Sequence, residues 1–244
     1  MTYATKALEL AHRVAESQAE PVDRAAGLIV DALWAGGVVN AFGSGHSEAI
    51  AMEIAGRAGG LVPSNRLSPR DLVLYGGEPP GVLTSELERD PAIARRIYDL
   101  APVDPRDVFV LVSSSGVNGT VVELATIVKE RGHPLIAITS VEHSTRMTSR
   151  HPSGRRLLDL ADVVLDNGSP YGDAVLELPG GGTYGAVSTI TSALLAQMVV
   201  TEAVERLAAL GETPPIYLSV NVTGGDEHNK ALESRYAGRI RRGA

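Results

Sequence analysis

Two short runs rich in serine and glycine carry the residues best suited to hold an anion. The first is Gly43-Ser44-Gly45-His46-Ser47, and the second runs from Ser113 to Thr120 with the sequence SSSGVNGT. Each follows an apolar stretch and precedes an amphipathic one, which is the pattern of a strand, a tight turn and a helix. Free backbone N–H groups and the dipole at a helix N-terminus favour negative charge. Both runs therefore predict an anion-binding turn.

Side chains of these turns can surround a phosphate without a cation. Ser113, Ser115 and either Asn118 or Thr120 supply donors in the second turn, and Ser47 adds one from the first. Ordinary turn and N-cap residues would give either run alone the same composition. Two such turns, each after a buried strand, favour the phosphate interpretation.

A nucleotide fits these turns poorly. The Rossmann fingerprint needs a third glycine where this chain has Glu48, and an acidic residue about 20 positions further on. The stretch at that distance reads GGLVPSNRL and holds no acid. The Gly-Lys-Ser/Thr of a Walker A loop is missing as well.

The elements that must position the turns alternate between apolar strands and amphipathic helices. We expect two helices over residues 4–33 with a break near Pro21, and a long helix over 187–211 with a capping serine or threonine. Residues 61–90 are rich in proline and glycine and suggest a flap or an insertion. The other expected strands and helices are, in order, strand 37–43, helix 47–57, strand from 107, helix 120–132, strand 134–140, a short helix and strand in 157–168, and a last helix in 214–240.

This order predicts an α/β fold, a three-layer αβα sandwich around a doubly wound, mainly parallel sheet. The N-terminal helices are expected to pack on the sheet or on a partner subunit. We expect one domain over residues 1–244, with a helical extension at 1–35, the core at 36–212, and a loop and helix at 213–244.

Composition narrows the class of protein. A net charge of -7 argues against a general nucleic-acid binder, and we expect the basic end with Arg239, Arg241 and Arg242 to be a solvated helix end. The chain has no cysteine, its N-terminal stretch is amphipathic, and no stretch approaches the roughly 20 apolar residues of a membrane span. These features predict a cytoplasmic protein with no membrane or nucleic-acid partner.

The two turns and several later segments resemble the SIS (sugar isomerase) domain, in which GxGxS and SxSGxT turns hold the phosphate of a phosphosugar. Nearly the whole chain is similar to a phosphoheptose-isomerase-like subgroup, through GSGHS, SSSGVNG, IAITSVEHS, YGDAVLEL and NVTGGDEHN. The resemblance implies a flavodoxin-like fold and phosphate ligands at Ser47, Ser113, Ser115 and Asn118, with Thr120 sharing the role. Asn118 stands where many members have threonine.

The resemblance also implies a homodimer or higher homo-oligomer with active sites near the subunit boundary. The N-terminal helices and the GGDEHN loop are candidates to reach a partner's site. Ser44, between the two turn glycines, and His46, between those glycines and Ser47, are expected to touch the substrate.

Isomerases and lyases of sugar phosphates begin when a base removes a proton next to a carbonyl, which requires a glutamate or histidine beside the sugar. Glu53 lies on the second turn of the helix after the first phosphate turn, among apolar neighbours. His228, in the GGDEHN loop, is of the type best suited to proton transfer near neutral pH. Glu177, near Asp173 in YGDAVLEL, ranks below Glu53. A paired structural carboxylate and a surface loop histidine are the alternatives for Glu53 and His228.

Two acidic residues of the loop-rich segment, Glu78 and Glu86, are candidates to close over the substrate. No histidine pair shows the spacing of a metal site, so we expect no metal and no cofactor, although some phosphoheptose isomerases of the superfamily use zinc.

The expected activity is isomerisation or dehydration of an (N-acetyl)hexosamine 6-phosphate or a related sugar phosphate. Phosphoheptose isomerase is an alternative, and a non-catalytic phosphosugar sensor is another. Such sensors usually carry a helix-turn-helix domain, for which the roughly 35 residues before the first strand are too few.

Overall fold

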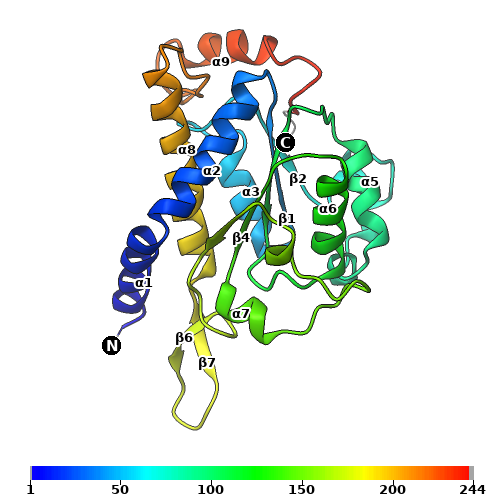
Figure 1. The fold of residues 1–244 in the computed structure, drawn as a ribbon, viewed down its shortest axis with the longest axis vertical. Coiled ribbons are helices and arrows are strands. Elements are labelled where there is room, and N and C mark those ends of the chain that lie inside the picture. Colours follow the sequence, from blue (N-terminus) through cyan, green and yellow to red (C-terminus); the bar gives the residue numbers. More distant parts are fainter. Residues whose placement is uncertain (1, 242–244) are drawn as a thin grey trace.

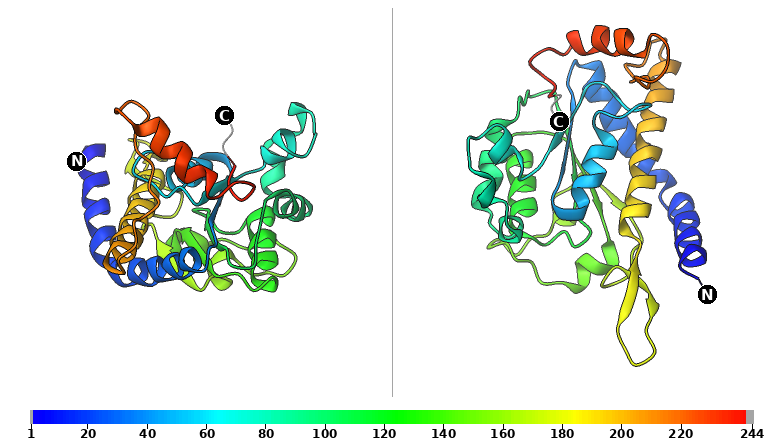
Figure 2. Two further views of the ribbon diagram at one scale, coloured as in Figure 1. Left: turned by 90° about the horizontal axis from the view of Figure 1, so that it is seen from above. Right: turned by 180° about the vertical axis from the view of Figure 1, so that it is seen from behind.

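The computed structural model describes residues 2–241. Its centre is a sheet of five parallel strands in the order β2-β1-β3-β4-β5 (Figure 1). The strands are β1 (Val39–Gly43), β2 (Ser64–Leu67), β3 (Val108–Val112), β4 (Leu135–Thr139) and β5 (Val163–Asp166). Helices cover both faces (Figure 2), which confirms the predicted αβα sandwich with a doubly wound parallel sheet.

Each face of the sheet has its own apolar core. Alternate residues of β3 show the division, because Val108, Val110 and Val112 belong to one cluster and Phe109 and Leu111 to the other. The first face is covered by α1 (Tyr3–Ser17), α2 (Ala19–Trp34), α3 (Glu48–Ile54) and α8 (Ser188–Ala209); the second is covered by α4 (Asp71–Leu74), α5 (Ala92–Leu100) and α6 (Gly119–Glu130). Burial on both faces explains why the central strands are continuously apolar.

The predicted break near Pro21 is wrong by a few residues. The chain turns at Gln18, and Pro21 lies in the first turn of α2. The N–H groups of a first turn have no partner within the helix, so a proline there costs no hydrogen bond.

Residues 61–90 were expected to form a flap or an insertion, but they also hold the edge strand β2. Its sequence, SNRL, lacks the apolar run of the other strands, so neither alternation nor composition marks it as a strand. The segment then forms α4 and two short 3-10 helices, η2 (Pro80–Val82) and η3 (Ser85–Glu88), before α5.

A two-stranded hairpin between β5 and α8 lies beyond the sheet and projects from it (Figure 1). It consists of β6 (Ala174–Glu177) and β7 (Thr183–Ala186), which pair antiparallel. Asp173, the residue before β6, has a φ of 62°. Its Oδ1 caps α8 by accepting hydrogen bonds from the N–H groups of Val187 (3.2 Å) and Ser188 (2.8 Å). The cap of α8 is therefore a distant aspartate and not the serine or threonine that we expected.

The last helix, α9 (Gly225–Ser234), lies at the opposite end of the sheet, where the strands begin (Figure 1). The chain then runs beside β2, where Asn65 bonds the carbonyl of Arg239 (2.9 Å) and the N–H of Arg241 (2.8 Å). Arg239 also reaches the buried carboxylate of Asp107 (2.6 Å). The prediction of a solvated helix end is therefore wrong for Arg239 and Arg241, because a buried carboxylate requires a counter-charge; Arg242 lies outside the described residues.

Two smaller helical segments flank the carboxyl edge, α7 (Val141–Arg146) after β4 and η4 (Leu157–Asp159) before β5. Within residues 2–241, no helix combines the length and apolar character that crossing a bilayer requires.

Candidate functional site

The structure brings the two predicted turns together. β1 and β3 are neighbours, and their last residues, Gly43 and Val112, are paired in register. The chain leaves β1 toward α3 on one face and leaves β3 toward α6 on the other. This is the switch point of the strand order, where doubly wound sheets bind their ligands.

The first turn is built on two glycines. A side chain on Gly43 would overlap the backbone carbonyl of Ser47, and Gly45 has a φ of 54°. The turn continues as η1 (Gly45–Ser47), which leads directly into α3. Ser44 and Ser47 are half-buried at this edge and His46 is exposed.

The second turn presents its donors from a fixed loop. The Oγ of Ser113 accepts a hydrogen bond from the N–H of Gly116 (3.1 Å), which leaves its own proton for another acceptor. Gly116 has a φ of 62°, and Ser115 beside it is half-buried. Asn118 holds the N-cap position of α6 in extended conformation. Ser47, Ser113, Ser115 and Asn118 therefore lie on adjacent turns, as the phosphate assignment requires.

Thr120 has a different place from the one we expected. Its side chain is buried, and its Oγ1 bonds the carbonyl oxygens of Asp90 (2.8 Å) and Leu87. The hydroxyl therefore ties η3 to α6 and has no donor left for a phosphate.

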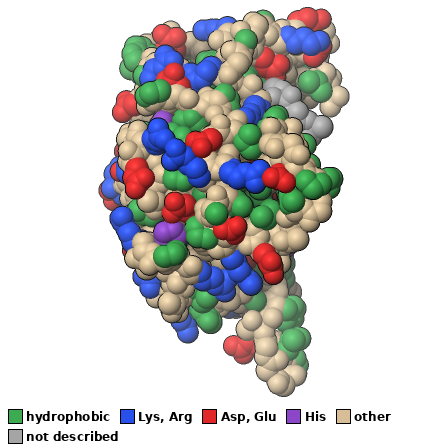
Figure 3. Space-filling view, turned by 90° about the vertical axis from the view of Figure 1, so that its right-hand side faces the viewer, with side chains coloured by type: hydrophobic (Ala, Val, Ile, Leu, Met, Phe, Trp, Pro, Cys, Tyr) green, Lys and Arg blue, Asp and Glu red, His purple; other side chains and the backbone are tan. Residues whose placement is uncertain are grey.

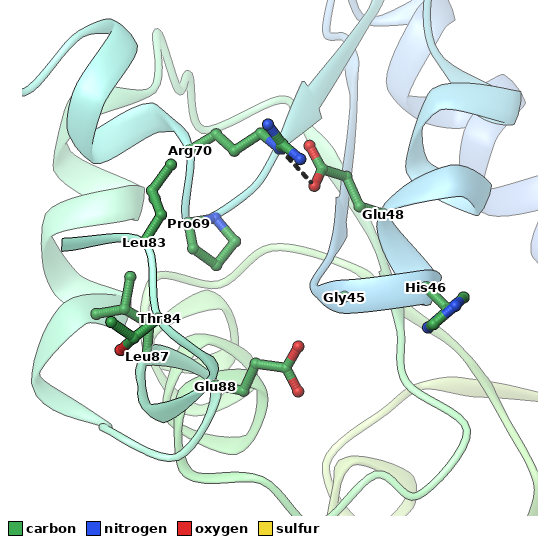
Figure 4. A pocket seen from close by; sticks show the side chains of 9 residues that line it. All are labelled: Gly45, His46, Glu48, Pro69, Arg70, Leu83, Thr84, Leu87 and Glu88. Carbon is green, nitrogen blue, oxygen red and sulfur yellow. Dashed lines mark hydrogen bonds and ion pairs between the residues drawn. The ribbon is translucent and has the colours of Figure 1, made fainter. Parts of the chain in front are cut away.

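A cleft of about 530 Å³ opens beside the first turn (Figure 4). One wall comes from Gly45, His46 and Glu48, and the other comes from Pro69, Arg70 and the segment that contains η3. On the second wall, the carboxylate of Glu88 approaches both turns. Its Oε1 lies 2.6 Å from the position that a Cβ on Gly45 would take, and its Oε2 accepts from Nδ2 of Asn118 (3.4 Å).

Glu88 was missed in the sequence. Glu78 and Glu86 of the same segment were singled out, but Glu78 pairs with Arg96 (2.6 Å) and Glu86 is exposed. Thr120 holds the η3 segment against α6. In this position the side chain of Glu88 points toward Gly45.

A cation that the sequence did not indicate also lies at the second turn. Arg150, in the loop after α7, donates from Nη1 to Oδ1 of Asn118 (2.9 Å), and its N–H bonds the carbonyl of Val117 (2.9 Å). The expectation of a phosphate site without a cation is therefore incomplete, because a guanidinium binds one of the proposed phosphate ligands.

Behind the first turn, Glu48 joins two arginines. Its Oε1 lies 3.2 Å from Nη1 of Arg66. Its Oε2 lies 3.1 Å from Nε of Arg70, the pair drawn in Figure 4. Arg66 also faces the fully buried Asp71, whose Oδ1 is 3.7 Å away. Burial raises the pKa of Asp71 to about 6, against the opposing effects of the Ser68 N–H and of Arg66 and Arg241.

Glu53 does not line this cleft. It pairs with Arg57, and its Oε1 accepts from Nε2 of Gln197 on α8 (2.8 Å). Its neighbours Ala49 and Met52 face the cleft side of α3, whereas Glu53 is turned toward α8. The structure thus gives Glu53 the paired, partly buried position that was the alternative to catalysis.

The other two proposed catalytic residues also lie away from the turns. Glu177 is exposed on the projecting hairpin. His228 lies on α9 at the amino edge of the sheet, and its Nε2 is 3.1 Å from the carbonyl oxygen of Ile216. Within one chain, neither joins the serine turns. Glu177 lies on a hairpin that projects away from the sheet, and α8 carries the chain from the carboxyl edge to the amino edge before His228 on α9 (Figure 1). His46, at the turn itself, points away from the cavity (Figure 4).

Across residues 2–241, no three histidine, aspartate or glutamate side chains form a group that could hold a metal ion.

Comparisons with known proteins identify the family and the fold. The family model of the SIS domain matches residues 2–140. The UPF0309 protein lmo0025 of Listeria monocytogenes is 40% identical over 241 residues, which cover 98% of each chain.

Solved structures share the fold at low sequence identity. A phosphoheptose isomerase from Francisella tularensis has a TM-score of 0.57 at 17% identity, over 83% of this chain and 95% of that one. The Vibrio vulnificus NanR protein, complexed with ManNAc-6P, has a TM-score of 0.52 at 17% identity, over 96% of this chain and 66% of that one. The family match covers more than half of the sequence and includes both serine turns, so this chain belongs to the SIS domain family.

Proposed function

We propose that the protein is an enzyme that removes a proton next to the carbonyl of a sugar phosphate. The observation that carries this proposal is the carboxylate of Glu88, which faces the cleft beside two turns suited to phosphate. A site that only bound phosphosugars would need the turns but not a carboxylate beside them.

In the proposed complex, Ser47, Ser113, Ser115 and Asn118 donate to the phosphate, and Arg150 supplies positive charge at its rim. The sugar then extends from the turns into the cleft that Glu88 faces. Ser44 and His46 of the first turn are also proposed to contact the sugar, which for His46 requires its ring to turn toward the cleft (Figure 4).

Glu88 takes the proton from the carbon next to the carbonyl; the electron pair of that C–H bond forms a C=C bond, and the carbonyl π electrons move to the oxygen, which gives an enolate. Return of the proton to the former carbonyl carbon, with transfer of the neighbouring hydroxyl proton to the enolate oxygen, gives an isomer. Departure of an oxygen from the next carbon, which Glu88 protonates, gives an unsaturated sugar and water. We propose an (N-acetyl)hexosamine 6-phosphate as substrate, with a heptose phosphate as the alternative.

The other candidate bases have weaker support. Glu53 is committed to Arg57 and Gln197, while Glu177 and His228 would need a partner subunit to reach the turns. A non-catalytic phosphosugar sensor is the second candidate function, since the serine turns alone suffice for it.

We also propose that the protein associates with itself. Four large apolar side chains on and beside the hairpin are exposed, namely Leu8 (71%), Leu178 (50%), Tyr184 (51%) and Ile190 (44%). A two-stranded hairpin is at best marginally stable alone, and a second copy would cover these side chains.

Nucleic acid is not a proposed partner, because the net charge is -7 and both signs of charge are interspersed on the face of α5 and α6 (Figure 3).

The test is a panel of hexosamine and heptose phosphates, each with its dephosphorylated form, incubated with the protein in deuterated water. We expect binding of the phosphorylated forms alone. Deuterium incorporation without mass loss assigns an isomerase, and loss of water assigns a dehydratase. Binding with neither change assigns a sensor, and equal affinity for both forms contradicts the phosphate site.

A further inference from the structure

The loop between α7 and η4, residues 147–157, which we call the strap, is bound to the second serine turn at two points. The N–H of Arg150 donates to the carbonyl of Val117 (2.9 Å). The N–H of Leu157 donates to the carbonyl of Gly116 (2.8 Å). Because a trans peptide group directs its N–H and its carbonyl to opposite sides, these bonds also turn the N–H groups of the same two peptide units away from the strap. The strap therefore helps to set how the second turn presents its backbone.

Side chains of the strap also bind its own backbone. The hydroxyl of Ser149 donates to the carbonyl of Arg155 (2.6 Å). The guanidinium of Arg156 donates to the carbonyl of Met147 from Nε (3.3 Å) and from Nη2 (3.2 Å). These bonds restrict the loop internally, so the place of the whole strap depends on the contacts that tie it to its surroundings.

One side chain, His151, links the strap to α6. Its imidazole is only 9% exposed, and its Nε2 lies 2.8 Å from Oε2 of Glu123. Its Nδ1 accepts from the N–H of Ser153 (3.2 Å) and lies 2.8 Å from the hydroxyl of that serine. A ring nitrogen that accepts from a backbone N–H carries no proton, so these partners assign the ring proton to Nε2, which donates to Glu123. The histidine thus joins the strap to the helix that Asn118 caps.

Arg150 directly precedes His151, and its guanidinium reaches Oδ1 of Asn118 (2.9 Å). That partner is a neutral amide, so the contact leaves the charge of the arginine for an anion. The side chain of Arg150 is exposed, and a long side chain loses rotamer entropy when it is held in one place. Its hold on the turn therefore depends on the position of its backbone, which the bond between His151 and Glu123 restricts.

We propose that Glu123 and His151 are positioning residues for Arg150 and, through it, for the phosphate of the substrate. They act without touching the ligand. Their hydrogen bond keeps the strap against α6, so that the guanidinium stays beside the serine turns. This inference rests on the proposed function, since the turns must hold the phosphate.

Loss of Glu123 has opposite effects through its charge and through its position. Its carboxylate is a negative charge near the start of α6, close to the second turn, so its removal alone would strengthen the binding of an anion. Displacement of Arg150 would weaken that binding instead. The direction of the change therefore separates the two effects.

The test is calorimetric titration of N-acetylglucosamine 6-phosphate and of inorganic phosphate. We expect Glu123→Ala to weaken the binding of both probes by about tenfold, because a hydrogen bond from a charged donor is displaced. Glu130→Ala is the matched control, since it removes the same charge from the exposed end of the same helix and should leave both affinities unchanged.

Arg150→Gln provides the second background for this test. We expect it to weaken both probes to a similar extent, and Glu123→Ala added to it to have no further effect. A merely structural role of Glu123 would weaken binding equally in both backgrounds, and that result would overturn the inference.

Two substitutions of His151 separate its two contacts. Glutamine can still donate to Glu123, whereas asparagine can replace only the acceptor that faces Ser153. We therefore expect His151→Gln to retain the affinity for both probes and His151→Asn to lose as much as Glu123→Ala does. Full affinity in His151→Asn would contradict the positioning role.

Unchanged or tighter binding in Glu123→Ala would overturn the inference and leave the proposed function standing. Failure of the unaltered protein to bind either probe would overturn both.

Discussion

Glu88 is the residue on which the proposed chemistry depends. Its replacement by glutamine keeps the size of the side chain and its contact with Asn118 but removes the base. We expect Glu88→Gln to lower turnover by about 100-fold or more while phosphosugar affinity changes little. Steady-state kinetics and calorimetry on the same samples measure the two effects.

Glu86→Gln is the control for Glu88, because Glu86 belongs to the same short helix and is exposed. Glu53→Gln tests the residue favoured by the sequence. Full activity in Glu88→Gln, together with loss of activity in Glu53→Gln, would contradict the assignment of Glu88 and identify Glu53 on α3 as the base.

Asp71 predicts a pH dependence of stability. Its pKa rises from 3.8 in the unfolded chain to about 6 in the folded protein, so the folded state holds the proton more tightly. The contribution of this group to the free energy of unfolding, about 3 kcal/mol, is therefore fully present below about pH 4. It is lost as the pH rises to about 6. We expect the difference in unfolding free energy between the unaltered protein and Asp71→Asn to change across this window and to be constant above it. Urea unfolding from pH 4 to 8 measures it, and a difference independent of pH would contradict the prediction.

The sequence predicts the candidate phosphate donors of the proposed site but not the charged residues beside them, for a physical reason. Ser47, Ser113, Ser115 and Asn118 follow apolar strands directly, so their position follows from local pattern. Glu88 and Arg150 come from 30 residues before and 32 residues after Asn118, in segments without a periodic signal. Tertiary packing, and not local sequence, brings these two to the turn.

The segment around η3 is an element whose position depends on one hydroxyl. Thr120 bonds two of its backbone carbonyls, those of Leu87 and Asp90. We expect Thr120→Val to destabilise this segment by about 0.5–1.5 kcal/mol, because two part-buried carbonyl groups lose their hydrogen-bond donor. Amide hydrogen exchange should then rise in residues 84–90, and KM should rise more than kcat falls.

Thr126→Val is the control for Thr120→Val. The hydroxyl of Thr126 bonds the carbonyl of Val122 within α6 itself (2.9 Å), so its loss should leave exchange in residues 84–90 unchanged. Unchanged exchange in Thr120→Val would show that other contacts hold η3.

At the scale of elements, the apolar strands and long helices could be predicted and the edge elements could not. β1, β3, β4 and β5 are buried on both faces or nearly so, which requires the apolar runs that identify them. β2 lacks such an apolar run, because its polar side chains form hydrogen bonds at the edge of the sheet. Nδ2 of Asn65, for example, donates to Oδ1 of Asn40 (3.0 Å). The β6–β7 hairpin is exposed and carries no burial pattern to detect.

For the whole molecule, the projecting hairpin predicts how copies associate. We expect Leu178→Asp combined with Tyr184→Asp to lower the mass in sedimentation experiments from that of an oligomer to that of a monomer, because charge opposes burial of the surface. Leu210→Asp is the control, since Leu210 is 57% exposed at the far end of α8. An unchanged mass in the double variant would place the contact elsewhere.

The pairing of Arg239 with Asp107 makes the site sensitive to events far from it. Asp107 immediately precedes β3, the strand that leads to the second serine turn. Its carboxylate also accepts a hydrogen bond from Asn40 (3.1 Å) in β1, the strand that leads to the first turn. Proteolysis at the exposed Ala237 and Gly238 would remove the arginine and leave both strands anchored to a buried charge without its counter-ion, which costs about 3–5 kcal/mol. Such a cut spares every residue of the cleft, yet the level of active protein in a cell would depend on whether that short stretch escapes proteases.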